Sequence, residues 1–371
     1  MKITGIRVFK TALPYVGGSY GWGAGNAITV AHSSVVVIDT DADLSGCGEF
    51  CPCGENYMIA HSEGVEAAAR LLAPKLLGED PRQVERIDRL MDHIIRGHGY
   101  AKAPIIAACW DILGKATDQP VWMLLGGKLT DGAPMYRVAP HKATAETIAE
   151  LDRYREAGYR QFQIKVGSDW STDIDRIRDT VPLLKPGEKA MADANQGWRV
   201  DNAIRVARAT RDLDYIFEQP CQTYEECQQV RRHVAQPMKL DECVTDMRMA
   251  HRIVEDHGAE ICCLKISNLG GLSKARKVRD YLVDNRIPVV SEDTWGGEIT
   301  TAVVAHFAAS TPTEFLVNST DLHNYNTRHT GTPAPRTCDG KLYASDTPGL
   351  GVEPDYDSLG PPVATYGTQQ P

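Results

Sequence analysis

The C-terminal two thirds of the chain alternate between short apolar runs and longer amphipathic segments. The apolar runs predict buried strands, and the segments between them repeat apolar residues at helical spacing. The predicted strands are residues 134–138, 161–166, 189–193, 215–218, 238–241, 261–266, 288–292 and 314–318. The predicted helices are residues 144–156, 170–184, 200–213, 224–233, 246–257, 272–284 and 297–309. A strand–helix unit that recurs about every 25 residues predicts a (β/α)8 barrel of parallel strands.

The N-terminal part of the chain has a different pattern, in which strands come first and helices follow. Alternation of apolar and polar residues predicts two half-buried strands, and helical spacing then predicts three helices. These segments are residues 2–13, 31–40, 64–77, 81–96 and 104–117. Asp80 is the expected N-cap of the second helix, with Pro81 at its first position.

Three regions follow from these patterns. Residues 1–125 are expected to form an α+β domain, because strands are followed by helices there. Residues 126–335 hold the barrel pattern, and residues 336–371 are rich in proline and glycine. We expect that last segment to return over the N-terminal domain or the outside of the barrel.

The composition excludes several classes of partner. The net charge is -9 and the pI about 5.7, so the chain lacks the basic footprint of a nucleic-acid-binding protein. No apolar run approaches the roughly 18 residues of a membrane span, and the N-terminus has no signal-peptide core. We therefore expect a cytoplasmic protein. Cys51-Pro52-Cys53 could bind a metal or be redox-active, but no second ligand pair follows, so we expect a structural role.

Acidic residues stand at the ends of three consecutive predicted strands. Asp193, Glu218 and Asp241 each close an apolar run. In barrels of this class the reactive residues lie at the C-terminal ends of the strands, so the three carboxylates should share one side of the barrel mouth. Any one of them could be a helix N-cap, but three in register favour a site for a hard cation such as Mg2+.

Two lysines stand on either side of these acids. Lys165 and Lys265 end the second and sixth predicted strands, and their stems emerge from apolar runs. Burial lowers the pKa of a lysine, so either side chain could supply a neutral amine as a base. The alternative is that they are surface charges.

This combination suits removal of a proton from the carbon next to a carboxylate. The reaction places a second negative charge on the substrate, and a bound cation can stabilise the resulting enediolate. If the second lysine returns the proton from the far side, the outcome is epimerisation. If a β-substituent leaves instead, the outcome is dehydration.

At this point the chain resembles the enolase superfamily, in the mandelate racemase/muconate lactonizing enzyme branch. The resemblance rests on Gln163-x-Lys165, Asp193-Ala194-Asn195, Glu218-Gln219-Pro220, Asp241-Glu242, and Lys265 followed by Gly270-Gly271-Leu272. It implies a modified TIM barrel, an N-terminal capping domain completed by the C-terminal segment, and a homo-oligomer. It also implies one Mg2+ ion held by Asp193, Glu218 and Asp241, with Lys165 and Lys265 as the acid/base pair acting on a small-molecule carboxylate.

The chain departs from this branch at one position. Many relatives carry Lys-x-Lys on the second strand, and here the first lysine is replaced by Gln163, a candidate hydrogen-bond donor to substrate. The motif Gln-x-Lys-Val-Gly and the segments 292–297 and 48–54 resemble members that act on proline derivatives, namely cis-3-hydroxy-L-proline dehydratases and proline-betaine 2-epimerases.

The substrate-binding candidates divide by the kind of ammonium group they would recognise. A quaternary ammonium calls for aromatic faces, and a secondary ammonium for a carboxylate. The aromatic candidates are Trp22, Tyr57 and Trp295, with Tyr20 beside them, and the polar candidates are Gln163, Asn195, Asp293 and Asp321. Trp22 and Tyr57 could equally belong to the core of the capping domain, and Asp293 and Asp321 could serve structural roles. His323 could assist hydroxide departure or be a surface residue.

The resemblance favours dehydration of cis-3-hydroxy-L-proline to 1-pyrroline-2-carboxylate. The alternative is a 2-epimerase of proline betaine or hydroxyproline betaine. A dipeptide epimerase or a muconate-type cycloisomerase would share the two lysines. A sugar-acid dehydratase would carry a histidine base on the seventh strand, where this chain has Asp293. A binding protein without activity would have no use for lysines opposed across a metal site.

Overall fold

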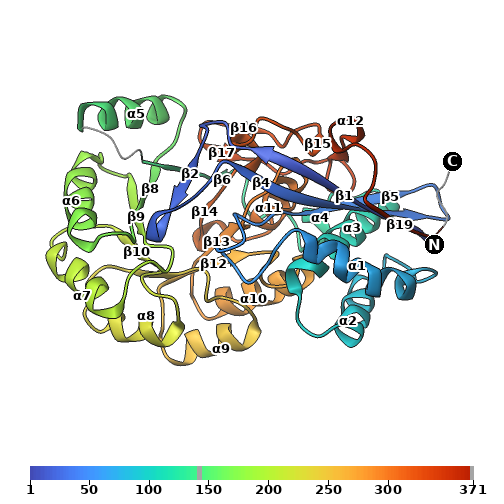
Figure 1. Cartoon of the computed structure of the whole chain (residues 1–371), viewed down its shortest axis with the longest axis horizontal. Helices are drawn as coiled ribbons and strands as arrows, with labels where there is room; N and C mark the ends of the chain where they lie inside the picture. The colour runs from blue at the N-terminus through green and yellow to red at the C-terminus, as the bar shows by residue number, and fades with distance from the viewer. Residues whose placement is uncertain (140–143, 368–371) are drawn as a thin grey trace.

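The computed structural model describes residues 1–139 and 144–367, and its larger part is an eight-stranded parallel barrel (Figure 1). The strands follow one another around the barrel in chain order. They are β7 (Tyr136–Val138), β8 (Gln161–Lys165), β9 (Lys189–Asp193), β10 (Ile216–Glu218), β11 (Met238–Leu240), β12 (Ile261–Lys265), β13 (Val289–Glu292) and β14 (Leu316–Ser319). A parallel bridge from Met135 to Ser319 brings the first and last strands together. The predicted barrel is therefore confirmed.

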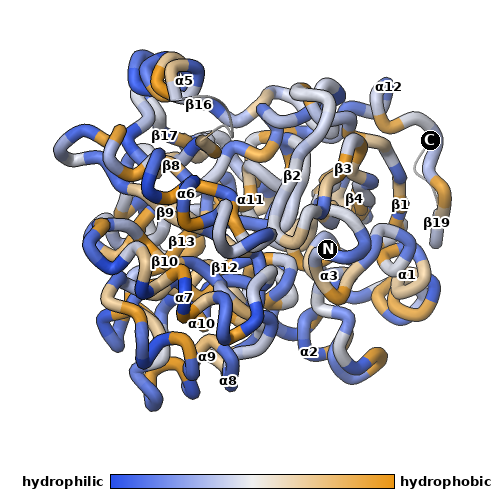
Figure 2. Tube along the Cα trace, turned by 60° about the vertical axis from the view of Figure 1, so that its left-hand side comes forward, coloured by the Kyte–Doolittle hydropathy of each residue, from blue (hydrophilic) through white to orange (hydrophobic). Residues whose placement is uncertain are grey.

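In the part of the chain that the structure describes, seven α-helices lie between the barrel strands. They are α5 (Thr144–Glu156), α6 (Trp170–Thr180), α7 (Val200–Ala209), α8 (Tyr224–Arg231), α9 (Met247–Glu255), α10 (Leu272–Asp284) and α11 (Glu298–Ala309). Several end earlier than predicted: α6 gives way to a 3-10 turn over Val181–Leu183, which contains Pro182. In the described residues the eighth strand is followed by the 3-10 helix η4 (Leu322–Tyr325). Figure 2 shows hydrophilic residues on the outer turns of the surrounding helices, as expected for helices that bury one face.

The N-terminal domain is a four-stranded antiparallel sheet covered by helices. The sheet order is β19 (Ala364–Gly367), β1 (Ile3–Pro14), β4 (Val30–Thr40) and β5 (Ser45–Phe50). The helices are α1 (Glu63–Leu76), α2 (Val84–Ile94) and α3 (Gly99–Thr117). Because β19 pairs with β1, the C-terminal segment completes this sheet, and both ends of the described chain lie on the same side in Figure 1.

Two helix starts differ from the prediction. The carboxylate of Asp80 accepts the backbone N–H of Arg82 at 3.0 Å, which forms a turn, so α2 begins at Val84 and Asp80 is not its N-cap. Helix α3 begins at Gly99 and runs through Pro104. Proline removes one helical hydrogen bond, and burial of nearly the whole of α3 compensates for this loss.

The prediction missed the strands that reach over the barrel mouth. A hairpin of β2 (Tyr20–Trp22) and β3 (Asn26–Ile28) lies beside β8 and β9 (Figure 1). The N–H of Ala24 donates to Gly167 O at 2.9 Å, and a Cβ atom on Gly23 would lie 2.1 Å from Ala194 O. Gly23 therefore allows the hairpin to contact the barrel backbone directly.

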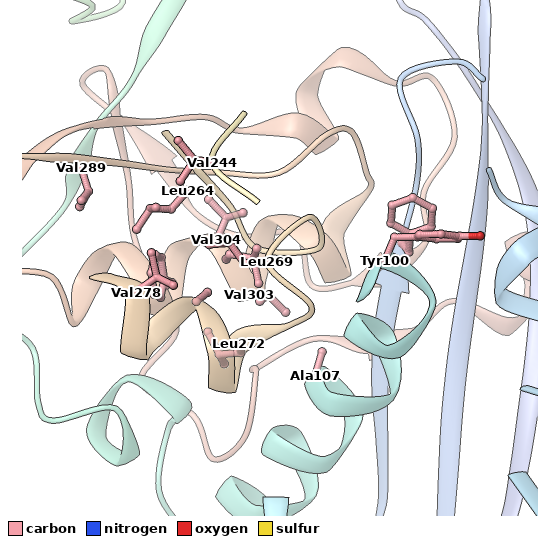
Figure 3. Close-up of a cluster of buried hydrophobic side chains, with 14 of the residues drawn as sticks. Tyr100, Ala107, Val244, Leu264, Leu269, Leu272, Val278, Val289, Val303 and Val304 are labelled. Atoms are coloured by element: carbon pink, nitrogen blue, oxygen red, sulfur yellow. The ribbon is translucent and has the colours of Figure 1, made fainter. Parts of the chain in front are cut away.

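The two domains share a buried interface. Leu272 at the start of α10 and Ala107 on α3 belong to one hydrophobic cluster (Figure 3). Gly271, at φ +106°, brings the barrel backbone close to α3: a Cβ there would lie 3.2 Å from Ala103 Cα. Trp110 Nε1 also donates to Ser273 Oγ at 3.0 Å. This packing fixes the N-terminal domain against the side of the barrel.

Glu49 on β5 caps a helix of the barrel. Helix α11 has Gly297 at its N-cap, which has no side chain to cap the helix. Glu49 accepts the backbone N–H groups of Gly297 and Thr300 at 2.9 Å each, and the hydroxyl of Ser33 at 2.7 Å. The N-terminal domain thus supplies the negative charge that a helix N-terminus favours.

Replacing Glu49 with alanine is expected to lower the free energy of unfolding by roughly 2–4 kcal/mol, because buried donors lose a charged acceptor. Urea denaturation of the purified variant measures this. Glu255→Ala is the matched control, since Glu255 is exposed at the end of α9 and its replacement should change stability by less than about 0.5 kcal/mol. Equal stability of the Glu49 variant and wild type would contradict the capping role.

His306 on α11 is buried as a neutral imidazole. Its Nδ1 accepts the N–H of Trp122 at 3.1 Å, and its Nε2 lies 3.0 Å from Leu350 O and must carry the proton. Burial lowers the pKa of His306 to about 4. Below about pH 6.5 the unfolded chain therefore binds a proton that the folded chain does not, and stability falls as pH decreases towards 4.

We expect His306 to contribute up to about 3 kcal/mol of stability above pH 6.5 that is lost near pH 4. Denaturation of wild type and His306→Gln at pH 7.5 and pH 4.5 isolates this contribution. The variant should lose less stability between the two pH values than wild type. An identical loss in both proteins would contradict a neutral buried His306.

None of the helices within residues 1–139 and 144–367 combines the length and apolar character needed to cross a bilayer.

Candidate active site

A cavity lies at the C-terminal ends of the barrel strands, beneath the hairpin and the segment that follows β5. Its empty volume is about 480 Å3. Ten of the predicted site residues line it: Trp22, Tyr57, Gln163, Lys165, Asp193, Asn195, Asp241, Lys265, Asp293 and Trp295. Of the other two predicted residues, Glu218 lies outside the wall with its Oε2 3.3 Å from Nε2 of Gln163, and Asp321 is also outside the wall.

Lys165 occupies one side of the cavity. Its Nζ lies 2.7 Å from Asp193 Oδ2 and 3.1 Å from Asn195 Oδ1. Asn195 Nδ2 donates to Glu242 Oε1 at 3.0 Å, which orients the amide so that its oxygen faces the lysine. Burial alone would lower the pKa of Lys165, but the Asp193 carboxylate outweighs it and the pKa lies well above its ordinary value.

Lys265 occupies the other side. Its ammonium group forms a close ion pair with Asp241 and lies 3.9 Å from Glu292 Oε2. Burial would lower the pKa of Lys265, but Asp241 again raises it well above the ordinary value. The expectation that burial lowers the pKa of each lysine is therefore wrong for the chain without a bound cation, because each lysine has a buried carboxylate as its partner.

The three predicted metal ligands each have a nitrogen partner. Gln163 Nε2 lies 3.0 Å from Asp193 Oδ2 and 3.3 Å from Glu218 Oε2. Glu218 Oε1 is also 2.6 Å from the Nζ of Lys239, a fully buried lysine. Both amide hydrogens of Gln163 are thus directed at carboxylates, and its expected role as a hydrogen-bond donor to substrate does not fit this arrangement.

Aromatic rings form the roof of the cavity. Tyr20 and Trp295 meet edge to face with ring centroids 5.0 Å apart, and Trp22 meets Tyr57 at 6.0 Å. The two lysines point at this roof: Lys165 Nζ is 5.8 Å from the Tyr20 ring, and Lys265 Nζ is 5.4 Å from the Tyr57 ring. A small cation between the lysines would therefore face aromatic surfaces.

Asp293 and Asp321 are committed to protein partners. Asp293 accepts from Ser267, with Oδ2 3.1 Å from the Ser267 N–H and Oδ1 in close contact with its hydroxyl, and from the Thr294 N–H at 2.8 Å. Burial raises the pKa of Asp293 to about 6. Asp321 forms a bidentate ion pair with Arg137 at 2.5 and 2.7 Å. Neither carboxylate is free to pair with a substrate ammonium.

With this geometry established, the sequence comparisons identify the family. Residues 25–126 match the mandelate racemase/muconate lactonizing enzyme N-terminal domain, and residues 146–358 match the enolase C-terminal domain-like family. The chain belongs to the mandelate racemase/muconate lactonizing enzyme branch of the enolase superfamily. The resemblance seen in the sequence is confirmed, and the chain is an enzyme of this superfamily.

Several members of the family resemble the chain over most or all of its length. It is 45% identical over 366 residues to the cis-3-hydroxy-L-proline dehydratase of Roseibium aggregatum, covering 99% of this chain and 100% of that protein. It is 28% identical to an N-succinyl-L-Arg/Lys racemase of Bacillus cereus, covering 75% of this chain and 76% of that protein. A Roseovarius nubinhibens family member of solved structure is 76% identical, with a TM-score of 0.98 and coverage of 99% and 100%.

Magnesium is a family property, and the donor set of this chain fits it. One Roseovarius nubinhibens relative, 34% identical with a TM-score of 0.93 over 99% and 100% of the chains, was solved in complex with magnesium. Here, burial first and then the neighbouring Asp193 raise the pKa of Glu218 to about 7. A cation bound beside Glu218 would favour the charged form of this buried carboxylate. Buried oxygen ligands on adjacent strands suit Mg2+.

A second group of possible metal ligands lies deeper in the barrel. One possible ligand atom from each of Asp241, Cys263 and Glu292 lies within 4.8 Å of the other two. Among the described residues, the predicted ligands Asp193, Glu218 and Asp241 do not form a group this close. Cys263 Sγ instead donates to Glu292 Oε2 at 3.0 Å, and burial holds the pKa of its thiol well above the ordinary value. A protonated thiol is a poor ligand for a hard cation, so this group does not suit Mg2+.

Sequence reasoning missed several residues of the cavity wall and floor. Lys239 stands two residues before Asp241, so strand alternation could have placed both on the inner face of the barrel. Tyr136 on β7 donates its hydroxyl to Glu292 at 2.5 Å. Cys53 lines the cavity, whereas Cys51 lies behind it and its carbonyl accepts the hydroxyl of Thr294 at 2.6 Å. The cavity position of Cys53 follows from the path of the segment after β5, for which the sequence gives no signal.

Proposed function

We propose that the enzyme dehydrates cis-3-hydroxy-L-proline to 1-pyrroline-2-carboxylate. The observation that carries this proposal is the pair of buried lysines on opposite sides of one small cavity, retained in a chain that aligns end to end with a dehydratase of that substrate.

A single Mg2+ ion held by Asp193, Glu218 and Asp241 would supply the positive charge that stabilises the enediolate. Those carboxylates now hold Lys165 and Lys265 as ammonium ions. When their oxygens are committed to a cation, the lysines lose that support, and burial then favours the neutral amine that a base requires. Asn195 holds Lys165 in place through its side-chain oxygen.

The stereochemistry of the substrate matches two opposed lysines. In cis-3-hydroxy-L-proline the hydroxyl is on the same ring face as the carboxylate, so the C2 hydrogen and the hydroxyl lie on opposite faces. One lysine removes the C2 proton, and the electrons of the C2–H bond move into the carboxylate to give the enediolate. They then return to form the C2=C3 bond. The C3–O bond breaks, and the opposite ammonium gives its proton to the departing hydroxyl, which leaves as water. The enamine product then tautomerises to 1-pyrroline-2-carboxylate.

The alternative is 2-epimerisation, in which the opposite ammonium returns its proton to C2. The aromatic roof favours it, because ring faces suit a quaternary ammonium such as that of proline betaine. Dipeptide epimerases are related at lower identity: the L-Ala-D/L-Glu epimerase of Bacillus subtilis is 27% identical over 93% of this chain and 92% of its own.

A panel of three compounds with Mg2+ tests the proposal. We expect water loss from cis-3-hydroxy-L-proline to have the highest kcat/KM. The trans isomer should lose water roughly 100-fold more slowly, because its C2 hydrogen and hydroxyl share one face and the acid on the other face cannot assist. Proline betaine should be the poorest substrate. Faster epimerisation of the betaine than dehydration of the cis isomer would make the enzyme a betaine epimerase.

Self-association and a cytoplasmic location stay predictions for this chain.

A further inference from the structure

The side chain of Gln163 has one polar atom without a partner. The residue is 2% exposed and lines the cavity from β8. Its Oε1 atom is buried and accepts no hydrogen bond. Among the described residues that line the cavity, no other buried side-chain oxygen or nitrogen is left without a partner in this way. A buried acceptor of this kind is costly unless a ligand satisfies it.

The orientation of the Gln163 amide follows from its neighbours. Its Nε2 contacts two carboxylates, those of Asp193 and Glu218. A carboxylate accepts hydrogen bonds, so the group that faces it must be the NH2 group. A flipped amide would place three oxygens against one another. The carbonyl oxygen is therefore the free end of the side chain.

The carboxylates in and beside the cavity that could otherwise receive an ammonium group are occupied. Asp321 is paired with Arg137, and Asp293 accepts from Ser267 and Thr294. Glu292 accepts from Tyr136 at 2.5 Å and lies among lysines. An N–H donor on the substrate thus finds its open acceptor at Gln163.

We propose that Gln163 Oε1 accepts a hydrogen bond from the ring ammonium of the substrate, and that it selects amines with an N–H over quaternary ammonium compounds. The inference rests on the proposed function and deepens it by naming the group that recognises the amine. A betaine nitrogen has no hydrogen to donate and would bury the carbonyl without a partner. Gln163 and the aromatic roof therefore act on the same nitrogen with opposite preferences.

The test compares cis-3-hydroxy-L-proline with its N-methyl and N,N-dimethyl derivatives at saturating Mg2+. Wild type is expected to show a kcat/KM at least about tenfold lower for the dimethyl compound than for the parent. Gln163→Met has similar volume and no acceptor, so its ratio should fall to within about threefold. Gln161→Met is the matched control: Gln161 donates to Val317 O and accepts from Asn318 in the barrel wall, and its ratio should equal that of wild type.

Ligand-induced shifts in Tm provide the same comparison without turnover, so an inactive variant still gives a result. If Gln163→Met keeps the wild-type ratio, the methyl groups are excluded by size, and the assignment to Gln163 is overturned. If wild type prefers the dimethyl compound, the assignment is also overturned while the enolisation chemistry stands. Wild type could fail to convert cis-3-hydroxy-L-proline and still show a larger Tm shift with it than with the dimethyl compound. In that case the proposed dehydration fails and the recognition role of Gln163 holds.

Discussion

Replacing either Lys165 or Lys265 with methionine is expected to lower kcat by roughly 1,000-fold, because each lysine transfers a proton in the proposed reaction. Methionine preserves the length of the buried stem and removes the charge. The two variants should differ in the step they block. The variant without the base should exchange no C2 hydrogen with D2O, whereas the variant without the opposite lysine should still exchange it but lose water slowly.

The matched control for these variants is Lys189→Met, which changes an exposed lysine at the opposite end of β9. It should keep wild-type kcat. Circular dichroism and Tm with Mg2+ present establish that the active-site variants fold. Wild-type turnover by either folded variant would contradict the role given to that lysine.

Removal of the metal is the second change with a large expected effect. Dialysis against a chelator should lower turnover by roughly 1,000-fold or more, since the enediolate loses its main electrostatic support, and Mg2+ should restore it. Mg2+ should also raise Tm, because it binds the folded chain and stabilises the charged form of Glu218, whose pKa is raised by burial and by the neighbouring Asp193.

Substitutions at the proposed metal ligands distinguish loss of Mg2+ binding from a general loss of folding. Asp193→Asn, Glu218→Gln and Asp241→Asn should each abolish the Mg2+-induced rise in Tm. Asp280→Asn, whose side chain is 52% exposed on α10, should keep it. Undiminished turnover in excess chelator, or a normal Mg2+ response in all three ligand variants, would contradict the metal mechanism.

The positions of the main candidate residues could be predicted from the sequence because barrel geometry is regular. Parallel strands end at one rim, so residues that close apolar runs must meet there. The sequence therefore predicts that Lys165, Asp193 and Lys265 share one cavity, and in the structure all three line it. The same regularity would have found Lys239, which shares a strand face with Asp241.

The pairing of charges could not be predicted in this way. Asp321 follows β14 as the acids follow their strands, but Arg137 on the adjacent strand β7 takes both of its oxygens. That pairing depends on closure of the barrel between its first and last strands, which links residues far apart in the sequence. The same holds for Glu49, whose role depends on how the N-terminal domain meets Gly297.

The resting state of the lysines depends on the same long-range pairing. Apolar neighbours in the sequence indicate burial, and burial alone lowers a lysine pKa. The direction reverses because Asp193 and Asp241 project into the same cavity. A lysine pKa in such a site thus depends on which cations occupy its carboxylates, and this is a property of the assembled site.

The most direct test of the central claim is proton NMR of cis-3-hydroxy-L-proline with wild-type enzyme and Mg2+ in D2O. The proposal predicts loss of the C2 proton signal and formation of 1-pyrroline-2-carboxylate, with both changes abolished by chelator. Deuterium incorporation at C2 with the hydroxyl retained to the end of the reaction would show an epimerase. A spectrum that does not change would contradict the assignment of this substrate.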